Sequence, residues 1–239
     1  MSKTLIFTAT YNESRNIKEL ISQIFELKND LNLLIVDDNS PDKTFEIIEK
    51  LAFTNKNIFL HKREKKLGLN TAHIYAYDFA LKNNYEKLIT MDADLSHDPK
   101  EIPKIIKLLD KEAFVIGSRY INGGKNDLPT RRLILSVIGN KFIKALLKSD
   151  GTEFTSSFRG FNLKRLNNFH FNQIDSNGYS FFMETVIRLN LLGHNSCEFP
   201  IHFKNREYGI SKIPRIEIFR TLFNVFKLFF NKFKKHNSK

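Results

Sequence analysis

The first half of the chain alternates strand-length apolar runs with amphipathic segments, and this alternation constrains the fold more than any other feature. The apolar runs lie at residues 4–9, 33–36, 58–61, 87–91 and 113–117. The segments between them repeat apolar residues every three or four positions, at 16–27, 42–51, 71–81 and 100–109. Strands that alternate with helices in this way predict an α/β fold, with a mostly parallel sheet flanked by helices on both faces.

Polar segments directly follow several of the predicted strands. They are TYNE at 10–13, DDNSP at 37–41, DAD at 92–94 and SRY at 118–120. In open α/β sheets, ligands bind at the edge where the carboxyl ends of the strands meet. We therefore expect these segments to gather at one edge and to form one site.

The stretch LITMDADLSHDP, residues 88–99, concentrates negative charge in a chain whose formal net charge is +12. Mg²⁺ and Mn²⁺ prefer oxygen ligands, often one or two carboxylates together with substrate phosphates. Asp92 and Asp94 can point to opposite sides of the chain, so that one binds sugar or ribose hydroxyls and the other a metal that bridges a diphosphate. Asp98 precedes Pro99 and is expected to cap a helix instead.

The second half predicts helices at 129–148, 180–192 and 214–235. In the last of these, one polar stripe runs along an otherwise apolar segment and consists of Arg220, Asn224, Lys227, Asn231 and Lys234. This pattern is typical of a helix that lies in a membrane interface, and it also fits a helix docked on the protein core or in a dimer. No run reaches the ~20 apolar residues that cross a bilayer, and the N-terminal apolar segment is too short for a signal peptide.

The basic charge alone leaves several classes of partner open. It fits a nucleic-acid surface, an anionic membrane, a phosphate-bearing substrate or a plain solvated face. A nucleic-acid-binding module would leave the acidic edge unexplained, so we expect no nucleic acid. A sugar-phosphate nucleotidyltransferase would carry a glycine-rich loop after its first strand, and TATYNESRN contains no glycine. The single cysteine, Cys197, is expected to be a small apolar residue rather than a nucleophile.

Eight motifs in order carry a resemblance to a known family. They are TATYNESRNI, LLIVDDNSPDKT, KKLGLNTA, MDADLSHDP, IGSRYINGG, TSSFRGF, GYSFFMETVIRL and FPIHFKNREYGISK. Over residues 3–213 they resemble the dolichyl-phosphate mannosyltransferase branch of family 2 glycosyltransferases. The resemblance implies a GT-A fold for residues 1–213, and the residue pattern itself indicates a basic amphipathic helix or tail at 214–239.

The same resemblance implies an activity and a place in the cell. It implies inverting transfer of a sugar, expected to be mannose from GDP-mannose, onto a polyprenyl or dolichyl phosphate, with Mg²⁺ or Mn²⁺ as cofactor. The protein would be cytoplasmic and peripheral on the cytoplasmic face of the membrane. The alternative is a family 2 enzyme that uses another, UDP-linked sugar or a hydroxyl acceptor in cell-surface polysaccharide synthesis.

The resemblance also implies roles for particular residues. Donor and metal positions are Tyr11, Glu13 and Asp38 for base and ribose, Asp92 and Asp94 as the acidic pair, and Ser96 at a further metal-ligand position. Phosphate-binding positions are Arg119 and Arg131 near the diphosphate or acceptor phosphate, and Arg206 and Lys212 on a closing loop. Glu184 falls where a family base often lies, and it is either that base or a carboxylate that orients Arg206 or Lys212. Thr10 replaces the proline that usually precedes the tyrosine, and Ser96 stands where some relatives have a glutamine ligand.

Overall fold

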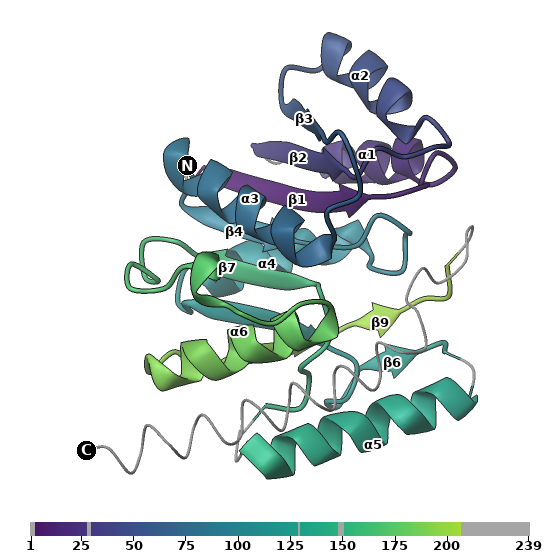
Figure 1. Cartoon of the computed structure of the whole chain (residues 1–239). Helices are drawn as coiled ribbons and strands as arrows, with labels where there is room; N and C mark the ends of the chain where they lie inside the picture. The colour runs from purple at the N-terminus through teal and green to yellow at the C-terminus, as the bar shows by residue number, and fades with distance from the viewer. Residues whose placement is uncertain (1–2, 28–29, 129, 148–150, 207–239) are drawn as a thin grey trace.

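The computed structural model describes residues 3–27, 30–128, 130–147 and 151–206. Lys212, the remainder of the REYGISK motif after Arg206, and the predicted helix at 214–235 lie outside the described residues. In the described part, strands and helices alternate along the first half of the chain as the sequence predicts. Figure 1 shows the sheet in the middle of the molecule, with helices on either side.

The main sheet has the strand order β3-β2-β1-β4-β7-β5-β8. Its strands are β1 (Thr4–Thr10), β2 (Leu31–Asp37), β3 (Ile58–Lys62), β4 (Lys87–Thr90), β5 (Phe114–Ser118), β7 (Arg159–Asn162) and β8 (Cys197–Pro200). All neighbouring strands are parallel except those that pair with β7, which is antiparallel to both β4 and β5. Because β7 is antiparallel to both of its neighbours, β4 and β5 are parallel to each other. The carboxyl ends of β1, β2, β4 and β5 therefore lie at one edge, which confirms the expected gathering of the polar segments.

The inserted strand β7 was not predicted from the sequence. It has only four residues, and one of them is Gly160. A Cβ atom at Gly160 would lie 2.5 Å from Ile105 Cγ2 and 2.9 Å from Leu109 Cδ1. The absence of a side chain therefore allows helix α4 (Ile102–Leu109) to pack directly on β7.

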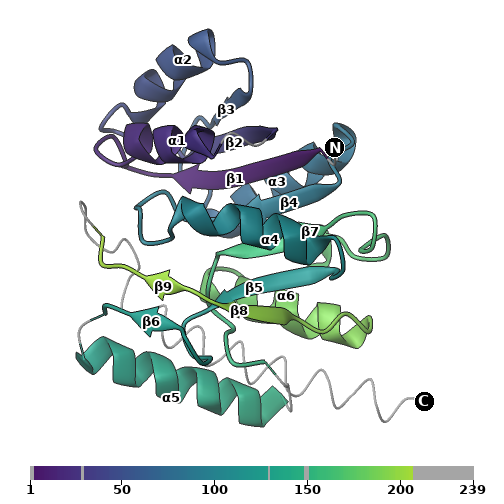
Figure 2. The same ribbon diagram turned by 180° about the vertical axis from the view of Figure 1, so that it is seen from behind.

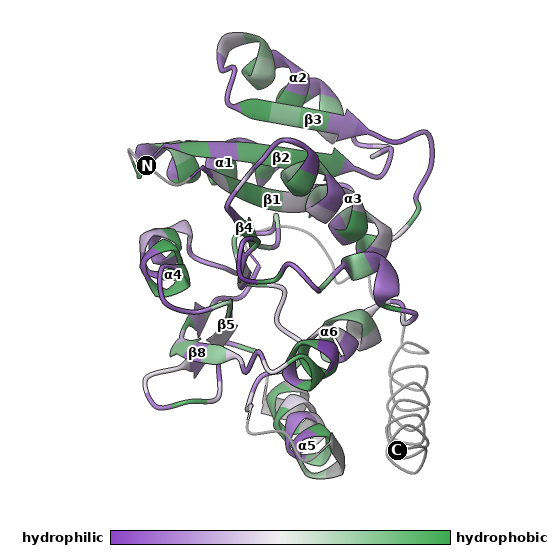
Figure 3. Ribbon diagram, turned by 90° about the vertical axis from the view of Figure 1, so that its left-hand side faces the viewer, coloured by the Kyte–Doolittle hydropathy of each residue, from purple (hydrophilic) through white to green (hydrophobic). Residues whose placement is uncertain are grey.

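The helices cover both faces of the sheet. Helices α1 (Ile17–Glu26), α2 (Thr44–Thr54) and α4 contribute to one buried apolar cluster, and α3 (Leu69–Lys82) and α6 (Tyr179–Leu191) contribute to the other. Figure 2, seen from behind, shows α1 and α4 in front of the sheet, whereas α3 and α6 lie in front in Figure 1. Figure 3 shows the hydrophobic residues that run along β2 and β3. All the helices predicted within the described residues are confirmed, with ends shifted by a few residues.

A smaller layer lies beyond the β5 side of the sheet. Strands β6 (Lys125–Asn126) and β9 (His202–Phe203) form a separate parallel pair, next to helix α5 (Thr130–Leu147). Short 3₁₀ turns occur at η1 (Pro99–Glu101) and η2 (Phe171–Gln173). None of the helices in the described ranges is long and apolar enough to cross a membrane.

Two buried basic side chains lie in or beside the aromatic part of the core. His73 packs against Phe7, Phe181 and Phe182, and burial lowers its pKa to about 3, so the ring is neutral. Arg159 donates from its guanidinium to the carbonyl oxygens of Phe154, Ser156 and Phe182, and burial lowers its pKa to about 9. Arg159 thereby ties the segment before β7 to helix α6.

Candidate active site

The ends of β1 and β2 form a hydrogen-bonded platform. Thr10 and Asp37 are opposite each other in the parallel register, and Thr10 Oγ1 donates to Asp37 Oδ2 at 2.7 Å. The Ser40 hydroxyl donates to the same oxygen at 2.6 Å. Asp37 is fully buried. Its carboxylate thus shapes the turn after β2 and leaves the next residue, Asp38, to face the edge of the site.

Asp38 is held by the segment that follows β3. Arg63 Nη1 lies 2.8 Å from Asp38 Oδ1, and the backbone N–H of Gly68 donates to Asp38 Oδ2 at 3.0 Å. Both side chains of the ion pair are nearly buried. Arg63 was not among the predicted site residues, although it directly follows β3 and the rule that gathers strand ends at one edge points to it.

Tyr11 and Glu13 lie on the loop between β1 and α1. Lys66 Nζ lies over the Tyr11 ring, 3.9 Å from its centroid. Glu13 is buried, and its Oε2 accepts from Asn16 Nδ2 at 2.7 Å, while its backbone carbonyl accepts from the first amides of α1. Glu13 therefore organises the start of α1, whereas Tyr11 presents an aromatic face beside a cation at the site edge.

Asp92 is the more exposed of the two DxD carboxylates, with 34% of its side chain accessible. Ser157 Oγ donates to Asp92 Oδ1 at 2.6 Å, from the segment that leads into β7. The Asp92 backbone N–H donates to His97 Nδ1 at 3.2 Å. Burial lowers the pKa of His97, so its ring is neutral and Nδ1 can accept this bond. Asp92 is thus fixed in place while it keeps access to solvent.

Asp94 is almost buried and tightly fixed by its own loop. Ser96 donates to Asp94 Oδ1 through both its hydroxyl, at 2.5 Å, and its backbone N–H, at 3.1 Å. Between them, Leu95 has φ 62°, in the left-handed region. A non-glycine residue in a sparsely populated conformation costs about 1 to 3 kcal/mol, and such strain concentrates at functional sites. The conformation that orients the Asp94 carboxylate therefore lowers the stability of the loop.

Arg206 contacts the remaining oxygen of Asp94. Arg206 Nε lies 2.8 Å from Asp94 Oδ2. Two residues earlier, Lys204 Nζ lies 2.8 Å from Asp98 Oδ2. From the sequence, Arg206 was expected to bind phosphate. In the structure its guanidinium contacts the acidic loop, where the metal was expected. Asp98 also accepts from the Lys100 backbone N–H, which confirms its expected role as a helix cap.

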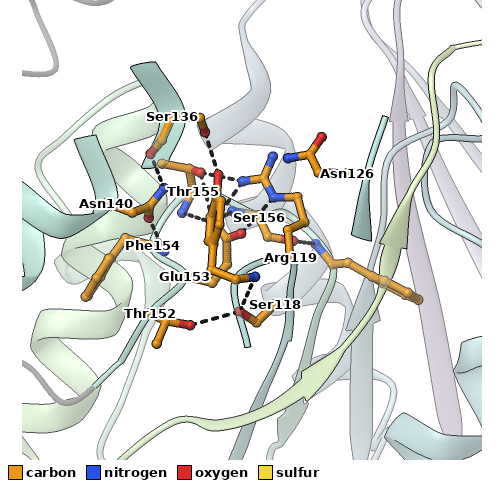
Figure 4. Close-up of polar contacts among 12 residues, drawn as sticks. Ser118, Arg119, Asn126, Ser136, Asn140, Thr152, Glu153, Phe154, Thr155 and Ser156 are labelled. Carbon is orange, nitrogen blue, oxygen red and sulfur yellow. Dashed lines mark hydrogen bonds and ion pairs between the residues drawn. The ribbon is translucent and has the colours of Figure 1, made fainter. Parts of the chain in front are cut away.

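Arg119, expected near a phosphate, lies in a buried ion pair (Figure 4). Its Nε and Nη2 contact the two oxygens of Glu153 at 2.8 and 3.0 Å, and Nη2 also donates to Thr155 Oγ1. Glu153 is fully buried, and burial raises its pKa, but the charge of Arg119 and the hydrogen bonds from Arg119 and Thr155 together hold the pKa below the usual value. The Glu153 carboxylate thus remains charged and organises residues 153–156. Glu153 was not among the residues predicted from the sequence.

Glu184 and Arg131 complete the predicted set within the described residues. Glu184 is buried on α6, where it accepts from Arg188 Nε at 2.6 Å and from the backbone N–H of Ser176 at 3.0 Å. In this structure Glu184 contacts Arg188, one turn further along the helix, while Arg206 pairs with Asp94. Arg131 lies in the first turn of α5, and its side chain is outside the described part of the structure.

The donor set at the acidic loop fits a hard divalent cation. The described residues hold no group of three or more His, Cys, Asp and Glu side chains that could enclose a metal by themselves. Mg²⁺ commonly uses only one or two protein carboxylates and takes its other oxygens from water and substrate phosphates. Asp92 and Asp94 supply such a pair, and the guanidinium of Arg206 already marks Asp94 Oδ2 as a site for positive charge.

Comparison with known sequences identifies relatives over nearly the whole chain. The family model described as Glycosyl transferase family 2 matches residues 5–169. A relative from Mycolicibacterium smegmatis, named polyprenol monophosphomannose synthase, is 33% identical over 226 residues, which cover 93% of this chain and 85% of the relative. A second, from Micrococcus luteus, is named undecaprenyl-phosphate mannosyltransferase; it is 31% identical over 88% of this chain and 87% of the relative.

Solved structures share the architecture at low sequence identity. Mannosyltransferase PcManGT from Pyrobaculum calidifontis, in complex with GDP-Man and Mn²⁺, aligns with a TM-score of 0.56 and 18% identity; the match covers 87% of this chain but only 58% of that longer one. Glucosyl-3-phosphoglycerate synthase from Mycobacterium tuberculosis, in complex with UDP, aligns with a TM-score of 0.61 and 16% identity over 95% of this chain and 79% of the other. These likenesses confirm the GT-A fold expected from the sequence.

Proposed function

The chain belongs to glycosyl transferase family 2, and on that basis we propose that it transfers mannose from GDP-mannose onto a polyprenyl phosphate, with inversion at the sugar. Membership of this family makes it a glycosyltransferase rather than a sugar-phosphate nucleotidyltransferase. Both curated relatives carry names of mannosyl transfer to a polyprenyl lipid. The observation that carries the proposal is the contact of Asp94 with Arg206. It brings a carboxylate suited to a divalent cation next to a guanidinium suited to phosphate oxygens.

The donor would bind along the edge formed by β1, β2 and β4. Tyr11 offers a ring for base stacking, and Asp38 offers a carboxylate that Arg63 and Gly68 hold in position. Glu13 and Asp92 are the further polar groups for the ribose and sugar hydroxyls. Asp38 and Glu13 are buried, and Asp92 is held by the Ser157 hydroxyl, so these carboxylates are preorganised before the donor arrives.

Asp92 and Asp94, with Ser96 beside them, are the residues that would hold Mg²⁺ or Mn²⁺. A bound divalent cation would neutralise charge on the departing diphosphate. The Ser96 hydroxyl donates to Asp94 Oδ1, so its direct contribution in this arrangement is to orient that carboxylate. Arg206, and Lys212 beyond the described residues, would add positive charge around the phosphates as the leaving group develops its charge.

The acceptor phosphate needs little help from a base because it is already anionic. This chemistry agrees with the environment of Glu184, whose carboxylate is buried and bonded to Arg188 and to the Ser176 backbone. We therefore assign Glu184 to the organisation of α6 and its preceding loop. Arg119 likewise supports the site through Glu153, and Arg131 is the candidate for direct contact with the acceptor phosphate.

Peripheral binding to the cytoplasmic face of a membrane is part of the proposal. Helix α5 docks through Ser136, Asn140 and Ile143 and exposes an apolar stripe made of Ile134, Ile138 and Phe142. The segment 214–239 carries the second amphipathic pattern, outside the described residues. Together they would bury apolar side chains near the acyl region and bring basic groups to lipid phosphates.

One assay tests the proposed reaction. Purified protein is incubated with a panel of radiolabelled nucleotide sugars, with polyprenyl phosphate as acceptor, and label in the organic phase is measured. We expect transfer from GDP-mannose and a glycolipid product that mild acid releases as mannose. Transfer only from a UDP-sugar, or only to a hydroxyl-bearing acceptor, would refute the assignment of donor or acceptor while leaving the family unchanged.

A further inference from the structure

Two short segments meet side by side at the candidate metal site. We call residues 92–98 the aspartate loop and residues 204–206 the basic segment. The Lys204 backbone N–H donates to the Ser96 carbonyl at 3.0 Å, and Lys204 Nζ lies 2.8 Å from Asp98 Oδ2. Arg206 Nε lies 2.8 Å from Asp94 Oδ2. The basic segment is therefore attached to the aspartate loop by one backbone contact and two ion pairs.

The two ion pairs differ in what they cover. Asp98 is a helix cap, and its pairing with Lys204 leaves the DxD carboxylates untouched. Asp94, in contrast, has one oxygen occupied by Ser96, and only 5% of its side chain is exposed. Arg206 contacts the other oxygen. A divalent cation at Asp94 Oδ2 would lie within a few ångströms of this guanidinium, and the two positive charges would repel each other.

We infer that Arg206 closes the metal-ligating oxygen of Asp94 in the donor-free enzyme and moves to the donor diphosphate when the cation and nucleotide bind together. The inference rests on the proposed function, because it takes Asp94 as a metal ligand. The diphosphate provides the negative charge that the guanidinium needs once it leaves Asp94, and a guanidinium is well suited to phosphate oxygens. Arg206 thereby weakens binding of the metal alone and makes metal and nucleotide bind cooperatively.

Metal binding without turnover tests this inference directly. Mn²⁺ is titrated into the full-length protein, with free Mn²⁺ read by electron paramagnetic resonance, in the presence and absence of GDP. The variants are Arg206→Gln, which removes the charge, Arg206→Lys, which retains it, and Lys204→Gln, which breaks the neighbouring ion pair. Lys204→Gln is the matched control, because it removes the same charge from the same segment without uncovering Asp94.

We expect Arg206→Gln to bind Mn²⁺ about tenfold more tightly than the wild type in the absence of GDP, since a competing charge in direct contact is gone. Arg206→Lys and Lys204→Gln should stay within about threefold of the wild type, as expected for retained or more distant, screened charge. GDP should strengthen Mn²⁺ binding more in the wild type than in Arg206→Gln. Turnover by Arg206→Gln should nevertheless fall, so that tighter metal binding accompanies slower transfer.

The outcomes separate the inference from the function on which it rests. Equal Mn²⁺ affinity of the wild type and Arg206→Gln, or an equal gain in Arg206→Gln and Lys204→Gln, would overturn the exchange at Asp94 and leave the proposed reaction standing. Absence of Mn²⁺ binding by every variant, with and without GDP, would overturn both the exchange and the metal role of Asp94. Transfer activity with the wrong donor, combined with the expected Mn²⁺ pattern, would refute the donor assignment alone.

Discussion

Arg119 and Glu153 form a bidentate ion pair at 2.8 and 3.0 Å, and both side chains are almost inaccessible to solvent. Glu153 also accepts from Thr155 and from the Ser156 backbone, so its carboxylate fixes the turn at residues 153–156, in the segment before β7. That segment supplies Ser157 to Asp92. The pair therefore links the end of β5 to the candidate donor site, and it makes Arg119 a positioning residue.

Replacing Glu153 should lower the free energy of unfolding, because its role is structural. Glu153→Gln leaves the Arg119 charge buried without its counter-charge, which costs about 3 to 5 kcal/mol. Denaturant unfolding should show this loss of free energy. In the double variant Arg119→Met with Glu153→Leu, part of the stability should return, because no unpaired charge is left. Unchanged stability of Glu153→Gln would contradict the structural role.

Replacing Asp94 should abolish transfer without unfolding the protein. Asp94→Asn removes the charge that would bind the metal, and turnover should fall by roughly a hundredfold or more. Because its partner Arg206 is partly exposed, loss of the ion pair should change stability by no more than about 1 kcal/mol. EDTA should inhibit the wild type, and Mg²⁺ or Mn²⁺ should restore activity. Full activity in EDTA would exclude the metal role.

Replacing Ser157 should impair catalysis through Asp92. Ser157→Ala removes a charge-assisted hydrogen bond of 2.6 Å, and such bonds contribute about 1.5 to 3 kcal/mol. We expect kcat/KM for the nucleotide sugar to fall about tenfold or more, with a melting temperature close to that of the wild type. Ser157→Thr keeps the hydroxyl and should retain most activity. If the threonine and alanine variants are equally impaired, packing rather than the hydrogen bond is responsible.

Acid should destabilise the protein through His73. Its pKa is lowered from 6.5 to about 3 in the folded state, so between these values the unfolded chain binds a proton that the native state does not. Stability therefore falls as pH decreases below about 6.5, by about 1.4 kcal/mol per unit from this residue. In His73→Leu, the slope of unfolding free energy against pH should be shallower by that amount. An unchanged slope in His73→Leu would contradict this account.

The exposed stripe on α5 should contribute to lipid binding. The double variant Ile134→Gln with Ile138→Gln removes two side chains that are 52% and 58% exposed, so thermal stability should not change. Burial of an apolar side chain contributes about 1.5 to 3 kcal/mol, and flotation with anionic liposomes should weaken by at least about tenfold. Transfer to a long polyprenyl phosphate should decrease, whereas transfer to a short, water-soluble acceptor should not. Unaltered flotation would show that α5 does not contact the bilayer.

Deletion of residues 214–239 separates the contribution of the C-terminal segment. If this segment binds the membrane, the truncated protein should remain folded and should float less at low salt. If it packs on the protein core instead, the truncated protein should unfold or aggregate. The position of this segment stays a prediction from its sequence pattern.

Strands β1 to β5 and helices α1 to α6 were predictable because each carries its own periodicity. The gathering of the polar segments was predictable for a second reason, which Thr10 and Asp37 illustrate. Parallel strands bring their carboxyl ends together whatever the details of packing. Strand β7 was not predictable, since four residues containing Gly160 have no clear alternation, and the close packing of α4 over this glycine is a long-range contact.

The sequence by itself determined the α/β architecture, the family and the acidic edge at Asp92 and Asp94, because local periodicity and motif spacing are properties of short segments. Only the tertiary structure decided which charges meet across the chain: Arg119 with Glu153, and Arg206 with Asp94. The side-chain type tells that an arginine needs an anion, but not which one. That choice follows from burial and from the packing of segments far apart in the chain, which bring particular carboxylates within hydrogen-bond distance.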